Sequence, residues 1–341
     1  MGFFKRKTAP SAVHPITGFW QWWTSEGGAR FDTAVTSGQW GNLPSEMSAQ
    51  LDAVHPGLAW DTGPGRTARN LLTVSSEGDA ALRRIAEQWL RAAPAPNRSW
   101  EFAAARQPLQ DAIDNTIEID GHSLHLREAR FSITEDPERE LLDIAVYHPL
   151  FSAMSGQGPL QVSFLLLDWL LGEDGVERWV GAIDATDISE TATATASDLT
   201  AAVNAMAAQI QPDTWAVMEG LNSSGNRLIV SARRPLRWID HPLFDLHTGV
   251  HLPYQDERDD GLPITASLDA LRRTEDDIAT ALGIRGLLVA HETAAGVRTL
   301  HYYSDSEDQN GRDTIDLAAH AAGGTTQHNI DPGWTEVRQF S

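Results

Sequence analysis

The feature that most constrains the fold is the order of strand and helix signals in residues 258–341. Leu262 to Ala266 is a short β-compatible run, and Ser267 after it suits the N-cap of a helix. The apolar side chains of this predicted helix share one face: Leu268, Leu271, Ile278 and Leu282. Gly283 follows at the position where a left-handed residue commonly ends a helix. The segment is therefore predicted to open with a strand and an amphipathic helix.

Two further strands and a second helix are predicted after this first helix. Residues 286–292 and 297–304 are strand-like, and residues 293–296 supply a hairpin loop. An alanine-rich helix is expected over residues 313–322, and a last strand closes the segment. That strand carries three apolar side chains: Trp334, Val337 and Phe340. The order βαββαβ is ferredoxin-like, with four strands and two helices on one face of the sheet. The other face stays open in such a domain, and we expect binding there.

Short motifs in this region resemble a bacterial family. They are Gly261-Leu262-Pro263, Glu275-Asp276, Arg298 leading into Tyr302-Tyr303, and Asp331-Pro332-Gly333-Trp334. With these motifs, about the last quarter of the chain is similar to the family catalogued as domain of unknown function 695. That family is related to the RNase E inhibitor protein B superfamily, whose better-known members are acidic regulators that bind a ribonuclease and cleave nothing themselves. The resemblance therefore implies an interaction protein.

The rest of the chain predicts a larger mixed α/β region, so the whole protein is expected to be α+β. Its 341 residues suffice for two or three domains, and 41% hydrophobic residues with 12 Trp indicate a folded core. The aromatic run Phe19 to Trp23 is predicted to pack in that core, with an interface as the alternative. The low-complexity run Ser189 to Ser197 indicates a domain boundary. We expect a flexible N-terminal tail at 1–11, an N-terminal α+β domain at 12–188, a strand-rich middle segment and linker at 189–257, and the ferredoxin-like domain at 258–341.

Two absences exclude several classes of chemistry. The chain has no Cys, which excludes disulfides, thiolate zinc sites and cysteine nucleophiles. Its only lysines are Lys5 and Lys7. A P-loop, a pyridoxal Schiff base and a kinase site each need an ε-amine in the folded body, so they are excluded as well. No cofactor is expected.

The charge predicts the kind of partner. A net charge of −21 repels phosphate backbones, which argues against nucleic-acid binding. The same charge attracts a basic protein, although solubility alone is an alternative explanation. Met1 to Lys7 does not have the order of a signal peptide, and no run approaches the ~20 apolar residues of a membrane span. We therefore expect a cytoplasmic protein whose oligomeric state the sequence leaves open.

Candidate site residues fall into two groups. The third strand of the C-terminal domain and the end of the chain are predicted to contact a partner through Arg298, His301, Tyr302, Tyr303, Trp334 and Arg338. Alternation along this strand does not reveal which side is exposed. A metal site is the second candidate, with His241, His247 and His251 as its ligands. Surface or packed histidines are the competing interpretation.

Two functions follow from these groups. The favoured hypothesis is a non-catalytic acidic binding or regulatory protein that docks a basic protein partner, either as a ribonuclease regulator or as a toxin-neutralising protein. The alternative is a metal-assisted hydrolase that depends on His and Asp.

Overall fold

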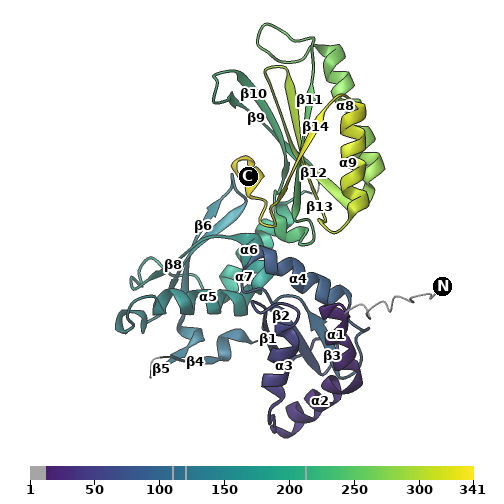
Figure 1. The fold of residues 1–341 in the computed structure, drawn as a ribbon. Helices are drawn as coiled ribbons and strands as arrows, with labels where there is room; N and C mark the ends of the chain where they lie inside the picture. Colours follow the sequence, from purple (N-terminus) through teal and green to yellow (C-terminus); the bar gives the residue numbers. More distant parts are fainter. Residues whose placement is uncertain (1–12, 110, 120, 212) are drawn as a thin grey trace, which may run out of the picture. The chain divides into compact units, whose positions relative to one another are not determined.

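The computed structural model describes residues 13–109, 111–119, 121–211 and 213–341. The predicted tail at 1–11 lies outside these residues. The chain divides into two compact units, one ending at Ala105 and one running from Arg106 to Ser341. Both combine helices with sheets, as expected for an α+β protein (Figure 1). Within the described part, no helix has the length and apolar character needed to cross a bilayer.

The first unit surrounds a small sheet with helices. Its elements are α1 (Pro15–Trp22), the π-helix η1 (Trp23–Gly27), α2 (Gly28–Ser37), α3 (Leu43–Asp52), β1 (Ala59–Pro64), β2 (Asn70–Ser75), α4 (Ala80–Arg91) and β3 (Trp100–Ala103). The strand order is β1-β2-β3, with β1 antiparallel and β3 parallel to β2. Asp79 caps α4 by accepting hydrogen bonds from the backbone N–H groups of Ala81 and Leu82.

Aromatic side chains fill the core of the first unit, as the run Phe19 to Trp23 predicts. Trp89 on α4 is completely buried, and its ring contacts Phe19 and Trp20. The indole N–H of Trp20 donates to the carbonyl of Trp89 at 2.8 Å, which fixes α1 against α4. In the same region Gly27 leaves room for the ring of Trp22, because a Cβ there would lie 3.0 Å from that ring.

The second unit begins with two small sheets and three helices. Its first elements are η2 (Ala112–Asp114), β4 (Thr116–Ile119), β5 (His122–His125), η3 (Leu126–Glu128), β6 (Arg130–Asp136), β7 (Leu141–Tyr147), η4 (Phe151–Ala153), α5 (Gly158–Leu171), α6 (Glu173–Trp179), β8 (Val180–Thr186) and α7 (Ala196–Gln209). Strands β4 and β5 form one sheet, and β6-β7-β8 form another. Thr195 and Asp198 make a capping box at the start of α7.

A six-stranded sheet forms the rest of the second unit. Its elements are β9 (Thr214–Leu221), β10 (Arg227–Arg234), η5 (Trp238–Asp240), β11 (Leu246–Pro253), α8 (Thr265–Leu282), η6 (Gly283–Arg285), β12 (Gly286–Ala294), β13 (Val297–Ser304), α9 (Gln309–Ala321), β14 (Thr325–Ile330) and η7 (Thr335–Phe340). The strand order is β14-β11-β13-β12-β10-β9, and each neighbouring pair is antiparallel. Ala295 and Gly296 both have positive φ and make the two-residue turn between β12 and β13.

Both faces of this sheet carry apolar clusters. Helices α8 and α9 lie on one face (Figure 1), where Leu271, Ile278 and Ile315 pack against Leu300 and Tyr302. On the other face, residues of β10, β12 and β13 pack against three side chains near the end of the chain: Trp334, Val337 and Phe340. The predicted open face is therefore partly covered by η7.

Two predictions for the C-terminal region are corrected by this architecture. The predicted first strand at 262–266 is a single bridge at Pro263, after which α8 begins. The strand that precedes α8 in the sheet is β11, because its Val250 and Leu252 supply the buried apolar face. The predicted last strand is the 3₁₀ helix η7, since apolar residues three apart share one face of a helix with three residues per turn. The last strand is instead the polar β14.

The unit and sheet boundaries also differ from the predicted ones. Along the sequence, the first compact unit ends at Ala105, which lies inside the predicted 12–188 domain. The six-stranded sheet begins with β9 at Thr214, well before residue 258. The hairpin of β9 and β10 extends the sheet at its β12 side, because β10 pairs with β12.

Candidate functional site

The residues predicted to contact a partner lie mostly in the core. Strand β13 is central in the sheet, between β11 and β12. Its Tyr302 and Tyr303 are fully buried on opposite faces, the first under α8 and α9 and the second against Trp334. His301 is also buried, beside Phe340. These residues do not form an exposed docking face, because α8 and α9 cover Tyr302 and the chain end with η7 covers Tyr303 and His301 on the side that was expected to be open.

Arg298 and Arg338 differ from the other predicted contacts. Arg298 is buried and donates to Glu275 Oε1 at 2.6 Å and to Thr293 Oγ1 at 2.9 Å. It therefore ties β13 to α8 and is unavailable to a partner. Arg338 on η7 is exposed, and it lines a cavity of the second unit.

The three predicted metal ligands make separate contacts. His241 stacks between Phe244 and Trp334, with ring centroids 5.5 and 5.8 Å away. His251 Nδ1 lies 3.1 Å from Thr299 Oγ1. Across residues 13–109, 111–119, 121–211 and 213–341, no three His, Asp or Glu side chains are arranged to hold a metal ion. Among the described residues, His241, His247 and His251 therefore do not come together as a metal site.

His247 instead belongs to a buried polar row that crosses the sheet. Its Nε2 lies 3.0 Å from His301 Nδ1, and His301 Nε2 lies 3.5 Å from Glu292 Oε1. Burial, together with the nearby His301, lowers the pKa of His247 to about 4. Its imidazole is therefore neutral at neutral pH, which lets one ring donate a hydrogen bond to the other.

A second buried polar centre, at Asp331, fastens η7 to the sheet. Its carboxylate accepts hydrogen bonds from the Tyr303 hydroxyl at 2.6 Å, from the Thr335 N–H and hydroxyl at 2.8 and 2.7 Å, and from the Glu336 N–H at 2.9 Å. Burial by itself raises the pKa of Asp331, but these four hydrogen bonds outweigh it and leave the pKa lowered. The charged carboxylate is thus the form that the fold stabilises.

We expect Asp331→Asn to lower the free energy of unfolding by about 2 kcal/mol near neutral pH, because an amide NH₂ then faces buried donors. The folded pKa lies below the unfolded value, so the contribution of Asp331 is present above about pH 4 and lost as the pH falls toward the folded pKa. Urea unfolding at neutral and acidic pH checks this. The difference between wild type and variant should narrow in acid, and Asp276→Asn, at an exposed site on α8, should change little. A difference that stays constant with pH contradicts the assignment.

The acidic segment 256–260 is the exposed candidate that the structure supports. It joins β11 to α8, and it is held in place by the Tyr254 hydroxyl, which donates to the carbonyl of Gly261 at 2.8 Å. Asp260 accepts hydrogen bonds from Arg258 and Arg227 at 2.5 and 2.8 Å. These bonds, that of Arg258 above all, lower the pKa of Asp260 to about 2. Both neighbouring arginines are therefore already engaged.

Three other carboxylates in this segment are exposed: Asp256, Glu257 and Asp259. None of them has an ion pair with any residue that the structure describes. Glu257 and Asp259 line an open groove of about 790 Å³ together with Asp260, and the lining also includes Arg227, Arg258, Leu221 and Ala295. We name this groove, together with the neighbouring Asp256, the acidic groove. Its chemistry is that of a receptor for positive charge.

The sequence analysis assigns no binding role to these carboxylates, and it misses a second feature altogether. Five arginines line one cavity in the second unit, and they come from four separate segments: Arg139, Arg178, Arg234, Arg237 and Arg338. No local motif joins residues so far apart in the sequence. The only sequence signal is the scarcity of lysine, which leaves arginine as nearly the sole cation of the folded chain.

Comparisons with known proteins cover one part of the chain. The chain matches no curated protein and no solved structure. The part that does match starts just before η5 and includes all elements from β11 to η7. Residues 237–340 match the model of a family described as "Family of unknown function (DUF695)".

Proposed function

We propose that this chain is a non-catalytic binding protein that docks a basic segment of a partner protein in the acidic groove. The observation that carries the proposal is the set of three exposed carboxylates, Asp256, Glu257 and Asp259, without ion pairs in the described structure. Closely spaced carboxylates that face solvent are stabilised when arginine or lysine side chains approach them, because opposite charges attract.

The groove also offers apolar surface to the stems of such side chains. Leu221 at the end of the edge strand β9 is 72% exposed and lines the groove. Val217 on the same strand is 71% exposed. Lysine and arginine bury their methylene stems on apolar surface while the charged head reaches a carboxylate. A basic peptide that runs beside β9 therefore meets both kinds of contact.

The match of residues 237–340 to a family of unknown function assigns no activity, so the relations that follow are proposals as well. We propose that the inner strands β14-β11-β13-β12 with α8 and α9 form a ferredoxin-like unit, to which the β9–β10 hairpin is added. We further propose that this unit is related to ribonuclease regulators of the RNase E inhibitor protein B type, and that the relation extends to the kind of partner, a basic nuclease or toxin. A cytoplasmic location is part of this proposal.

The test is a binding measurement with charge-neutral variants. Fluorescence anisotropy with a labelled peptide rich in Arg and Lys should show binding that weakens as salt rises toward about 0.15 M and beyond. The triple variant Asp256→Asn, Glu257→Gln, Asp259→Asn should bind about tenfold more weakly, because each exposed pair contributes about 0.5 kcal/mol.

The control for this test removes the same number of charges elsewhere. Asp269, Asp276 and Asp277 are exposed carboxylates on α8, outside the groove. Their triple change to Asn should leave peptide binding near the wild-type value. Equal losses in both triple variants would mean that only the net charge attracts the peptide, and the groove would then not be the docking site.

A further inference from the structure

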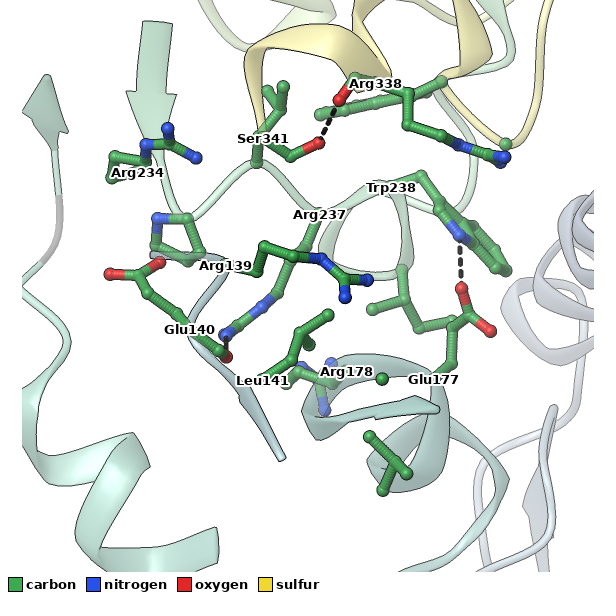
Figure 2. A pocket seen from close by; sticks show the side chains of 17 residues that line it. Arg139, Glu140, Leu141, Glu177, Arg178, Arg234, Arg237, Trp238, Arg338 and Ser341 are labelled. Atoms are coloured by element: carbon green, nitrogen blue, oxygen red, sulfur yellow. Dashed lines mark hydrogen bonds between the residues drawn. The ribbon is translucent and has the colours of Figure 1, made fainter. Parts of the chain in front are cut away.

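The second unit contains a cavity of about 380 Å³ that the acidic groove does not include. Four segments enclose it: the turn before β7 at 139–141, the end of α6 with the start of β8 at 177–181, the stretch 234–239 after β10, and 333–341 with η7. Figure 2 shows the arginine side chains of these segments around one space. A volume of this size accommodates a small organic molecule.

The charge of the cavity is opposite to that of the chain. Acidic residues outnumber basic ones by 47 to 26 over the whole sequence. In the cavity lining, five arginines face two glutamates, Glu140 and Glu177. One glutamate is already engaged, because the indole N–H of Trp238 donates to Glu177 Oε1 at 2.7 Å. Local positive charge in so acidic a protein indicates a site for anions.

Two of the arginines have guanidinium groups that are not committed to a hydrogen bond or ion pair in the described part of the chain. Neither Arg234 nor Arg338 has a side-chain hydrogen bond or ion pair with any residue that the structure describes. Arg178, in contrast, is paired with Asp240 at 2.6 Å. Arg139 reaches Asp136 only at 3.7 Å. At least two guanidinium groups are therefore free to bind a ligand.

Arg237 is held at the cavity by contacts that leave most of its donors unused. Its Nη2 donates to the carbonyl of Glu140 at 2.9 Å, and its guanidinium stacks over the ring of Trp179 at 4.3 Å. Burial lowers the pKa of Arg237, since the charged form loses solvation there. A bound anion would restore the favourable environment that burial removes.

We propose that this cavity binds a small organic anion through its phosphate groups. Guanidinium groups present paired N–H donors that match the oxygens of a phosphate, and arginine is preferred wherever this geometry matters. A phosphate carries its charge on one compact group. One or two phosphates therefore balance the positive charge of the arginines and still fit within the cavity. Trp238, Leu236 and Ile239 line the same space and provide an apolar wall for the organic part of the ligand.

The experiment is calorimetric titration of the full chain with inorganic phosphate, pyrophosphate, adenosine monophosphate and citrate. We expect pyrophosphate and adenosine monophosphate to bind, with inorganic phosphate weaker. In the double variant Arg234→Gln, Arg338→Gln, affinity should fall at least tenfold, because two charge-assisted contacts are lost. Neither side chain makes a hydrogen bond or ion pair with a described residue, so the variant should keep a melting temperature close to that of wild type.

Matched controls separate a site from general charge attraction. Arg272 and Arg273 are exposed on α8, and their double change to Gln removes the same charge outside the cavity. That variant should bind like wild type, as should the triple variant of the acidic groove. Arg338→Lys should recover only part of the affinity, since the charge remains but the paired donors are lost. No heat with any phosphate, equal losses in both double variants, or binding of citrate alone would overturn the proposal.

Discussion

Replacing Arg298 with alanine should lower the free energy of unfolding by about 3–5 kcal/mol, one of the two largest effects that we expect for single substitutions in this chain. Arg298 and Glu275 are 7% and 14% exposed and lie 2.6 Å apart, so the substitution leaves a buried carboxylate without its cation. The Thr293 hydroxyl also loses the hydrogen bond that it accepts from Arg298. Urea unfolding followed by circular dichroism measures the loss.

The pH dependence of this variant tests the cause. Burial raises the pKa of Glu275, while Arg298 opposes that rise. For a carboxyl whose folded pKa lies above its unfolded value, relative stability is greatest in acid and is lost as the pH rises through the folded pKa. Without Arg298 the pKa should rise further. The variant should therefore regain stability relative to wild type when the pH is lowered toward about 5.

A second replacement provides the control. In Arg298→Met, Glu275→Leu, both charges are replaced by apolar side chains of similar size, and most of the lost stability should return. If this double variant is as unstable as Arg298→Ala, the loss comes from packing rather than from an isolated charge. A loss below about 1 kcal/mol for Arg298→Ala would contradict the buried ion pair itself.

Trp89→Ala should destabilise the first unit by about 3–5 kcal/mol. The ring of Trp89 is completely buried and lies 4.6 Å from Trp20 and 5.5 Å from Phe19, measured between ring centroids. Its loss opens a cavity at the centre of the aromatic cluster. Hydrogen exchange should show loss of protection in α1 and α4, while β11 and β13 of the second unit keep theirs.

Trp89→Phe is the matched control, because it keeps an aromatic ring in the same place. It should lose less stability than Trp89→Ala, since the cavity left is smaller. If protection falls equally in both units after Trp89→Ala, the two units unfold together, and the division at Ala105 has no energetic counterpart.

Local pattern was sufficient for several elements of the second unit. The predicted strands at 286–292 and 297–304 correspond to β12 and β13, and the helix predicted at 313–322 corresponds to α9. Leu271, Ile278 and Leu282 are the buried residues of α8, as their spacing predicted. These predictions succeed because the spacing of apolar residues along a helix or strand reflects which side chains are buried in the fold.

The position of the first and last strands required tertiary information. The run at 262–266 is β-compatible, yet β11 occupies the place beside β13 because its alternating Val250 and Leu252 reach the core under the helices. Strand β14 is polar and lies at the sheet edge, so its sequence has no apolar signal. The apolar residues after it cover the sheet as η7 instead.

By itself the sequence determined the α+β class, the exclusion of cysteine and lysine chemistry, and the excess of negative charge, because these depend only on composition and on local periodicity. The tertiary structure decided what covers each face of β13, which carboxylates have no ion pair among the described residues, and that five arginines line one cavity. Alternation along a strand defines two faces but not what packs on either. Electrostatic interaction acts across space, so residues from distant segments form a site only when the fold brings them within a few ångströms of one another.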